Sequence, residues 1–512
     1  MTVIMKHQWI FPILCALSMG FWACSSPTSS SDHSNPADPS GSGNSSNSAD
    51  PSHPAEPSDP NNPGKLGIYY YGNGNTWGAA LVSESYDNSN SDTVSIRDRG
   101  DLYRVGYRFA GWNTNPDGTG DNFEAGSTMP KDEKATKLYA NWEKVFPLIS
   151  AGNEFSTLLT KDGNLYSSGD NGSGELGNGT LVKQWTFGPV GGDISGGGVK
   201  SVVSGRDHSF AILNDGSIAG WGTGESGKLG NNAERGIFCT PIRPMYTSDG
   251  HSSGLSRVAA VSAGRIQTAI LTDNGEYWAA GSRYLGALGN GNHKMQLTFE
   301  KIGDNIRSLS AGESYVMVIK NDGTLYAAGY GGHGRTGTTA DTTKRLTLNT
   351  GAGSDNAMVF TGKLNHTMLL KNDGHLFAVG NNNLGQLGVG NTQTQQSFKP
   401  VIDSTGEALA NVAFVSLGEA HSMILGNDGT LWAAGNNSDR RLGINGGVIQ
   451  DKAVMVMDKV AHVAAGYNHT LVVTEDGKLW AAGSNSQGQF GGNSAKTVLY
   501  NTWTEIDISS LR

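Results

Sequence analysis

Residues 222–228 have the spacing of a nucleotide-binding loop. Gly222, Gly224 and Gly227 form a G-x-G-x-x-G pattern, and Lys228 follows where a phosphate-binding lysine would stand. Such a loop cradles phosphates on backbone N–H groups at the start of a helix. Leu229, however, occupies the position at which Ser or Thr binds Mg²⁺, and the same glycines recur elsewhere in the chain as turn residues. We therefore interpret this segment as a turn and expect no cofactor.

Two sets of titratable residues could act as general bases, but both recur at fixed positions of a repeat. They are His208, His366, His421 and His469, and the acids Asp162, Asp215, Asp322, Asp373, Asp428 and Asp476. A catalytic group is needed once, in one cleft, whereas a turn or capping residue is needed in every repeat. We interpret both sets as structural, and no nucleophile motif stands apart from them. The sequence therefore predicts a protein that is not an enzyme.

Residues 113–124 nearly fit the calcium loop of an EF-hand. Asp117 and Glu124 match its ligand spacing, but the first ligand position holds Asn113 instead of Asp, and Pro116 lies inside the loop. The flanking residues are typical of strands, whereas an EF-hand loop joins two helices. A turn explains the segment better, and we expect no metal site.

Seven copies of one unit, each about 50 residues long, fill residues 144–512. Each copy runs from an apolar strand ending in Gly, through a second strand and a tight turn, to a third strand and a loop closed by Gly. The turn glycines are Gly163, Gly216, Gly275, Gly323, Gly374, Gly429 and Gly477. Asp-Gly and Asn-Gly turns between hydrophobic runs favour short hairpins, because Gly adopts a positive φ without steric cost. The centre of every unit is therefore predicted to be a β-hairpin.

A fourth strand recurs at residues 187–190, 299–302, 398–401 and 503–506. A lone four-stranded blade leaves both faces wet, so the blades must stack, and a ring of seven leaves no end face exposed. The sequence therefore predicts an all-β fold, a seven-bladed β-propeller with a small N-terminal module. It leaves open whether residues 503–506 complete the last unit or pair beside residues 145–149 to close the ring.

The repeats also carry a family resemblance. Residues 431–435 (LWAAG) and 385–388 (GQLG) resemble the regulator of chromosome condensation repeat, and the resemblance spans residues 144–512. It implies the propeller fold, whereas activity does not follow from fold alone. Members include a nuclear guanine-nucleotide exchange factor and a secreted bacterial propeller that inhibits β-lactamases. Because this chain carries export features, exchange activity is disfavoured.

Charge and cysteine content exclude several classes of protein. The net charge is −9 and no dense basic run occurs, which argues against a nucleic-acid partner. The only cysteines are Cys15, Cys24 and Cys239, and Cys15 lies in the hydrophobic leader. No disulfide framework or cysteine-based zinc site can be built from them, and we expect Cys239 to be buried.

The N-terminal residues have the features of an export signal. Residues 1–23 have a basic start, an apolar stretch and a small residue before the expected cleavage point, as in a signal peptide. Cys24 after that point resembles a bacterial lipoprotein signal, which implies that Cys24 is lipidated and anchors the chain to a membrane. Residues 24–64 are rich in Ser, Pro, Asp and Asn and predict a disordered tether. We expect a bacterial envelope protein of the outer membrane or cell surface; an ordinary secretory signal or an uncleaved anchor remains the alternative.

Aromatic and β-branched residues return in residues 65–143, which predicts a separate β module. The segments GYRFAGWNT at 106–114, DGTG at 117–120 and LYANW at 138–142 resemble the Listeria-Bacteroides repeat of bacterial surface proteins. This resemblance implies a small β-grasp-like spacer and surface display.

The most informative residues for binding are those that differ between copies. Because strand directions alternate, the loops after the first and third strands of each blade must meet at one rim. Several residues expected on this rim replace the Asn, Gly or Gln of the common pattern. The rim residues are Arg206, Arg265, Arg283, Tyr284, Tyr315, Tyr330, His333, Arg440, Arg441 and Tyr467. Tyr and Arg anchor many interfaces, although ordinary loop variation would also produce such differences. We expect a surface binding or adhesion scaffold for a protein or glycan; an inhibitor of a secreted enzyme is the alternative.

Overall fold

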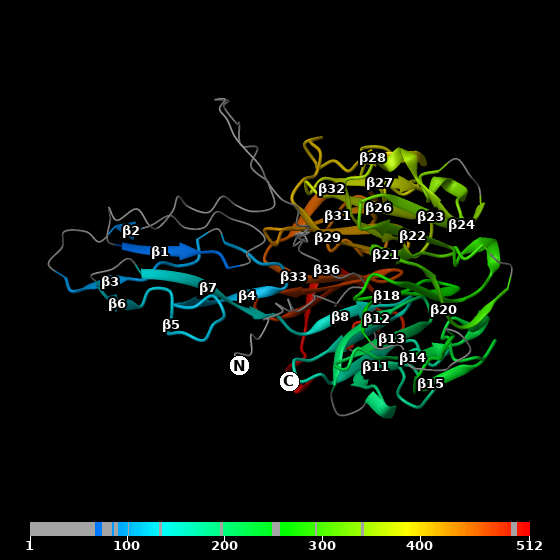
Figure 1. Cartoon of the computed structure of the whole chain (residues 1–512), viewed down its shortest axis with the longest axis horizontal. Helices are drawn as coiled ribbons and strands as arrows, with labels where there is room; N and C mark the ends of the chain where they lie inside the picture. The colour runs from blue at the N-terminus through cyan, green and yellow to red at the C-terminus, as the bar shows by residue number, and fades with distance from the viewer. Residues whose placement is uncertain are drawn as a thin grey trace, which may run out of the picture.

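The structure is a computed structural model that describes residues 67–73, 84–85, 91–100, 102–132, 136–194, 198–247, 257–291, 294–338, 342–492 and 499–511. The expected signal peptide, Cys24 and the tether at residues 24–64 lie outside these residues. The described residues form seven sheets of four or five strands arranged in a ring, and two further sheets in an N-terminal module (Figure 1). The chain is an all-β protein, a seven-bladed β-propeller preceded by a small β-grasp-like module, as the sequence predicts.

Each blade contributes its first strand to the wall of a central channel, and its second strand packs behind the first. The first strands are β8 (Leu148–Ala151), β12 (Val199–Ser204), β17 (Val258–Ala263), β21 (Ile306–Ala311), β25 (Asn356–Thr361), β29 (Val412–Leu417) and β33 (Val460–Ala465). The second strands are β9 (Phe155–Leu159), β13 (His208–Leu213), β18 (Gln267–Thr272), β22 (Tyr315–Lys320), β26 (His366–Lys371), β30 (His421–Gly426) and β34 (His469–Thr474). The second strands are almost wholly buried, because neighbouring blades cover both of their faces.

The outer half of each blade is a third strand followed by an edge strand. The third strands are β10 (Leu165–Gly169), β14 (Ile218–Thr223), β19 (Tyr277–Gly281), β23 (Leu325–Tyr330), β27 (Leu376–Gly380), β31 (Leu431–Asn436) and β35 (Leu479–Ser484). The edge strands are β11 (Gln184–Pro189), β15 (Ile237–Ile242), β20 (Gln296–Gly303), β24 (Thr342–Leu348), β28 (Gln395–Pro400), β32 (Ile449–Met457) and β36 (Leu499–Ile506), with β16 (Tyr246–Thr247) added parallel to β20. Cys239 lies on β15 and is half-buried, so the expectation of full burial is wrong.

Short 3-10 turns lie in several of the loops. They are η1 (Gly192–Ile194), η2 (Glu225–Gly227), η3 (Tyr284–Gly286), η4 (Gly332–Gly334), η5 (Thr350–Ala352) and η6 (Ser509–Leu511). Three of these, η2, η3 and η4, follow the third strands of blades two, three and four. The turn after each of these strands is therefore too short to be the start of an α-helix.

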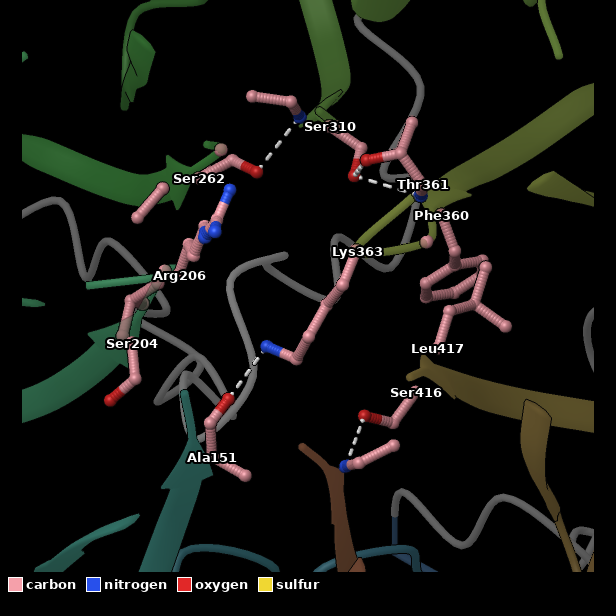
Figure 2. Close-up of a pocket in the computed structure, with 18 of the residues that line it drawn as sticks. Ala151, Ser204, Arg206, Ser262, Ser310, Phe360, Thr361, Lys363, Ser416 and Leu417 are labelled. Atoms are coloured by element: carbon pink, nitrogen blue, oxygen red, sulfur yellow. Dashed lines mark hydrogen bonds between the residues drawn. The ribbon is translucent and has the colours of Figure 1, made fainter. Parts of the chain in front are cut away.

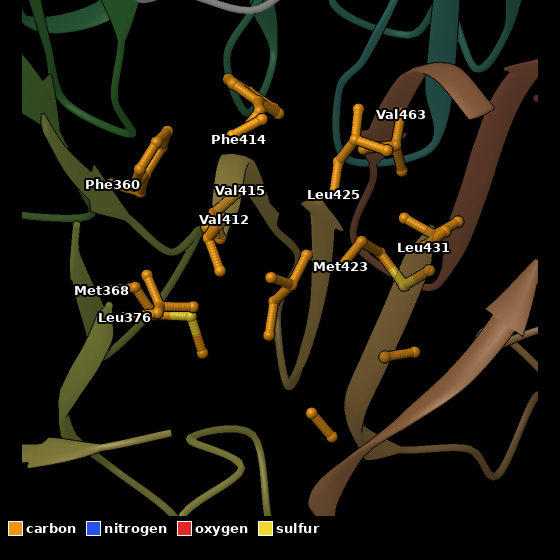
Figure 3. Close-up of a cluster of buried hydrophobic side chains, with 14 of the residues drawn as sticks. Phe360, Met368, Leu376, Val412, Phe414, Val415, Met423, Leu425, Leu431 and Val463 are labelled. Atoms are coloured by element: carbon orange, nitrogen blue, oxygen red, sulfur yellow. The ribbon is translucent and has the colours of Figure 1, made fainter. Parts of the chain in front are cut away.

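The hydrophobic core is divided among the junctions between blades. Figure 3 shows part of the core of blades five to seven, with Met368 on the blade-five side of Val412 and with Met423 on the other side, near Val463 of blade seven. The Phe360 and Phe414 rings are edge to face, with centroids 5.3 Å apart. Because each blade buries its two faces only against its neighbours, the ring must close for the core to be complete.

The ring closes between blade seven and blade one without a strand exchange. β36 pairs with β35 and so completes the last sequence unit, which settles the question that the sequence leaves open. The Phe187 N–H donates to the Gly491 carbonyl at 3.2 Å, and the His462 Nε2 donates to the Val145 carbonyl at 3.0 Å. The first of these bonds has a counterpart between blades three and four, where the Leu346 N–H donates to the Gly289 carbonyl at 3.2 Å.

The N-terminal module consists of a five-stranded mixed sheet and a separate two-stranded sheet, with a core of its own. Its strands are β1 (Gly67–Tyr71), β2 (Glu84–Ser85), β3 (Thr93–Ser95), β4 (Tyr107–Asn113), β5 (Asn122–Phe123), β6 (Thr128–Pro130) and β7 (Thr136–Lys144). The five-stranded sheet has the order β2-β1-β7-β4-β5, and the two-stranded sheet consists of β3 and β6. β7 lies between β1, to which it is parallel, and β4, to which it is antiparallel. Trp112 is fully buried and donates its indole N–H to the Arg97 carbonyl at 2.8 Å.

The module is docked on the propeller at the turns between second and third strands. Tyr103 is buried there and donates its hydroxyl to the Val460 carbonyl at 2.5 Å, and Arg99 forms an ion pair with Glu475. Lys161 of blade one pairs with Glu143 of the module at 2.8 Å. These turns lie at the opposite ends of the strands from the loops that follow first strands, so the module leaves the predicted rim uncovered.

Candidate binding face

The loops between first and second strands surround one mouth of the central channel, where a cavity of about 460 Å³ opens. Figure 2 looks into this cavity, with the first strands of several blades around it. The loops are joined to each other by backbone hydrogen bonds, for example from Asn153 N–H to the Arg206 carbonyl at 3.1 Å and from Tyr467 N–H to the Asn153 carbonyl at 3.2 Å. We call this mouth, together with the loops that follow third strands, the loop face.

Serine side chains connect neighbouring first strands just inside the mouth. Ser262 Oγ accepts the Ala311 N–H at 2.9 Å, and Ser416 Oγ accepts the Ala465 N–H at 2.9 Å. The first strand of a blade is the inner edge of its sheet, so its N–H groups would otherwise lack a partner in the channel. The hydroxyls therefore stiffen the channel wall.

Lys363 projects into the cavity and crosses to the opposite wall. Its Nζ donates to the Ala151 carbonyl of blade one at 2.7 Å, as Figure 2 shows. Burial lowers the pKa of this ammonium to about 8. Lys363 was not among the predicted site residues, although one signal was available: the loop between Gly362 and His366 has three residues, whereas the corresponding loop of every other blade has two.

Eight of the ten predicted rim residues reach the surface of the loop face. Arg206, Arg265, Arg283, Tyr284 and His333 are exposed, and Tyr330, Arg440 and Tyr467 are partly exposed. Tyr284 has 62% of its surface accessible. Tyr330 is less available, because the Arg335 guanidinium lies 4.6 Å from its ring centroid.

Tyr315 and Arg441 are buried, so their assignment to an exposed rim is wrong. Tyr315 occupies the position that histidine holds in four other blades, and its hydroxyl donates to the His366 carbonyl at 2.9 Å. Arg441 is held by Asp439 and lies 3.8 Å from Glu419. Both residues differ from the repeat because they satisfy local partners inside the propeller.

The recurring histidines join neighbouring blades, which confirms their structural interpretation. His208 Nε2 lies 2.9 Å from Thr268 Oγ1 of the next blade, and His469 Nε2 lies 3.0 Å from Ser156 Oγ across the ring closure. Gly418, which precedes the loop between the first and second strands of blade six, leaves room for the imidazole ring. A Cβ on Gly418 would lie 2.1 Å from His421 Cε1. Burial lowers the pKa of His208 to about 4.

The turn acids and the two motif-like loops are also structural. Asp215 Oδ1 accepts the Ser217 N–H at 2.9 Å, and Asp322 Oδ1 accepts the Thr324 N–H at 2.9 Å. In the calcium-like loop, Asn113 Oδ1 accepts the Asn115 N–H at 2.7 Å, and strands flank the loop. In the phosphate-loop-like segment, Lys228 is buried against Asp207. Both segments are therefore turns, as the sequence predicts.

The residue two positions before the loop-closing glycine is buried in every blade, a feature that sequence reasoning missed. These residues are Glu175, Lys228, Ala287, Arg335, Gln386, Arg441 and Gln489. The glutamines accept a backbone N–H two residues earlier, as Gln386 does from Leu384 at 3.0 Å. The cations of blades two, four and six instead pair with an acid of the neighbouring loop, as Arg335 does with Glu313 at 3.3 Å. This position holds the two loops of a blade together.

Glu175 occupies the same position but forms no ion pair with any described Lys or Arg, and burial raises its pKa to about 7. In the unfolded chain this carboxyl ionises near pH 4.3. The free energy of unfolding therefore falls as the pH rises from that value to about 7, and above pH 7 the loss is constant. We expect Glu175→Gln, which copies Gln386 and Gln489, to raise the free energy of unfolding by about 2 kcal/mol at pH 8. Urea unfolding at pH 8 and pH 4 measures this. An equal gain at both pH values would contradict the role of ionisation.

Two further observations concern the residues that the structure describes. Among them, no three His, Cys, Asp or Glu side chains are grouped closely enough to hold a metal ion. Within the same residues, no helix has the length and hydropathy needed to cross a membrane.

A rigid ring that presents variable loops around one hollow is a binding or regulatory scaffold, because loops on a fixed framework can vary without disturbing the core. Comparison with known proteins agrees with this class. Two family profiles, both described as the Regulator of chromosome condensation (RCC1) repeat, match residues 148–175, 199–228 and 460–489, and residues 162–212, 373–425 and 428–473.

The chain belongs to the RCC1 repeat family. It is 30% identical over 339 residues to the ultraviolet-B receptor UVR8 of Arabidopsis thaliana, a match covering 64% of this chain and 73% of UVR8. It is 28% identical to the human E3 ubiquitin-protein ligase HERC2, but the match covers only 6% of that protein. The solved structure of Prp20p from Saccharomyces cerevisiae superposes with a TM-score of 0.60 at 21% identity, covering 69% of this chain and 88% of Prp20p. At this identity the superposition shows a shared fold.

Proposed function

We propose that this chain is a non-enzymatic binding or adhesion scaffold, displayed on the cell envelope, that recognises a protein or glycan through the loop face. The observation that carries the proposal is that exposed Arg206 and Arg265 line the mouth of one hollow, while exposed Arg283, Tyr284 and His333 lie on the loops after third strands of the same face. Arginine and aromatic side chains supply most of the binding energy in many interfaces. The N-terminal module is docked on the far face and leaves these residues accessible.

Protein partners are supported by the relatives as well as by the loop face. Prp20p is described with binding properties to Gsp1p and histones, and a second structure shows yeast RCC1 bound to Kap60. Surface display rests on the sequence: the lipoprotein-like signal, the tether and the spacer-like module precede the propeller. An anchored scaffold with its loop face directed away from the module would be able to reach partners outside the cell.

Capture experiments test the binding face. Full-length chain carrying Cys24→Ser is immobilised and exposed to envelope proteins, secreted proteins and envelope glycans. We expect the double variant Arg206→Ala with Tyr284→Ala to bind the captured partner with an affinity at least about tenfold lower, because each truncation removes an exposed side chain that would anchor the partner. Met455→Ala, which removes an exposed apolar side chain on the outer wall, is the control. Unchanged affinity in the double variant would exclude this face, and loss of a captured enzyme's activity would favour an inhibitor.

The membrane anchor is tested separately. We expect the mature chain to begin at Cys24 with lipid attached and to partition into the detergent phase, because acyl chains bury many methylene groups. Cys24→Ser should shift the chain into the aqueous phase. Intact-mass analysis and detergent partition measure both effects. An unmodified mature chain in the aqueous phase would leave the protein secreted and not anchored.

A further inference from the structure

The central channel contains a partly buried cation, Lys363, with which no described carboxylate forms an ion pair. Lys363 has one recorded acceptor, the Ala151 carbonyl at 2.7 Å. An ammonium has three N–H donors, so two remain for other acceptors. Among the described residues, no Asp or Glu oxygen forms an ion pair with Lys363, although most other buried cations of the loop face have such a partner. A cation that is partly withdrawn from water without a counter-ion carries a desolvation cost, and a ligand carboxylate would offset that cost.

The position of Lys363 follows from a single extra residue. Six blades have two residues between the glycine that ends the first strand and the second strand, whereas blade five has Lys363, Leu364 and Asn365. The longer loop lets the lysine stem run across the cavity, as Figure 2 shows. The repeat would close equally well without it, so the insertion is not required for the blade to fold.

Hydroxyl groups that line the same cavity as Lys363 supply further donors. Ser262 and Ser416 line the cavity, and each accepts one backbone N–H from the next blade. With the oxygen used as an acceptor, the hydroxyl proton is available to donate toward the channel. The cavity thus presents an ammonium and at least two hydroxyls, which is a donor set suited to an anionic oxygen group.

The mouth of the cavity has the charge that would attract an anion. Its lining contains Arg206, Arg265 and Lys363 but only one carboxylate, Glu154, in a chain whose net charge is −9. Arg265 is paired with Glu313, whereas Arg206 is exposed. A cleft with low-dielectric walls focuses such a field and raises the local concentration of the opposite charge.

We propose that the channel mouth holds a carboxylate-binding site in which Lys363 receives the carboxylate, Ser262 and Ser416 donate hydrogen bonds, and Arg206 guides its entry. The volume of about 460 Å³ admits a small organic acid or one acidic side chain, but no folded element. The carboxylate comes either from a free small acid or from a partner that inserts an aspartate or glutamate. The first source is independent of the proposed function, and the second deepens it.

Calorimetric titration of the full-length Cys24→Ser chain separates the two sources. One arm uses succinate, and the other uses a short peptide with a central aspartate and blocked ends. We expect binding in at least one arm, weakened at least about tenfold by Lys363→Met, because a charge-assisted hydrogen bond is lost. Lys161→Met, which removes an exposed lysine on the opposite face, should bind as the parent does.

Each outcome decides the question. Succinate binding that requires Lys363 assigns the site to a free acid, and peptide binding alone assigns it to a partner's side chain. No binding in either arm, or equal binding by the parent and Lys363→Met, overturns the site. Thermal unfolding of Lys363→Met checks its fold, and we expect the variant to be at least as stable as the parent because a partly buried, unpaired charge is removed. If the parent chain captured no partner, or the Arg206→Ala and Tyr284→Ala double variant captured it unchanged, while succinate binding stayed intact, the proposed function would be contradicted and this site would stand.

Discussion

Lowering the pH from 7 to 5 should reduce the free energy of unfolding by about 2 kcal/mol for each buried histidine of the propeller. The five residues concerned are His208, His366, His421, His462 and His469, all without accessible surface. Burial lowers the pKa of His366 and His462 to about 4 and that of His469 to about 3. Each of these rings connects two blades, so the effect acts on the junctions that hold the ring together.

The direction of the effect follows from proton binding. In the unfolded chain a histidine takes up a proton near pH 6.5, whereas the buried rings stay neutral until about pH 4. Between these values the unfolded state binds more protons, so stability falls as the pH falls. Above pH 6.5 both states are neutral and the contribution of the histidines is constant. The loss is therefore confined to the window between about pH 6.5 and 4.

His469→Gln tests this prediction with a residue that the fold already uses. Gln267 holds the equivalent position in blade three and donates its side-chain N–H to the Tyr315 carbonyl at 3.0 Å. Between pH 7 and 5, we expect the free energy of unfolding of the variant to fall by about 2 kcal/mol less than that of the parent, as measured by urea unfolding. His333→Gln, on the exposed loop of blade four, is the control and should keep the parent's slope. An unchanged slope in His469→Gln would show that another group drives acid unfolding.

The fold could be predicted from the sequence because the same physical requirements repeat seven times. The turn glycines lie between second and third strands in every blade; Gly216, for example, has φ of 80°. The edge strands lie where residues 187–190 and 503–506 indicated, as β11 and β36. Ring closure could not be predicted, because both pairings would bury the same apolar residues and only the contacts of β35 with β36 distinguish them.

The binding face was harder to predict because a departure from the repeat has two possible causes. Tyr284 differs from its counterparts and is exposed, whereas Tyr315 differs and is buried as a replacement for histidine. Residue type alone does not separate these cases, since tyrosine suits both environments. Loop length separates them better: the single insertion that brings Lys363 into the channel is visible once the seven loops are aligned. Composition-based reasoning overlooked it because a lysine in a polar loop is ordinary.

Arg335→Met should lower the free energy of unfolding by about 3 kcal/mol, because it removes the cationic partner from a buried ion pair. Arg335 is 1% exposed and its guanidinium contacts Glu313 at 3.3 Å. Its Nε donates to the Gly332 carbonyl at 3.0 Å, which would lose its partner. This loss of unfolding free energy lies near the lower end of the range for a broken buried ion pair, because Glu313 keeps its contact with Arg265.

The same position in other blades supplies a matched second variant. Gln386 and Gln489 are neutral and accept a backbone N–H of their own loop. Glutamine in Arg335→Gln can form the same hydrogen bond, whereas methionine in Arg335→Met forms none. We therefore expect Arg335→Gln to be about 1 kcal/mol more stable than Arg335→Met in urea unfolding at pH 7, which corresponds to one neutral hydrogen bond. Arg283→Met, at an exposed site in the equivalent loop of blade three, should change stability by less than about 0.5 kcal/mol. If Arg335→Met were as stable as the parent, the buried pair would serve only to fix the relative position of the two loops, and the exposed residues of blade four would be expected to move with it.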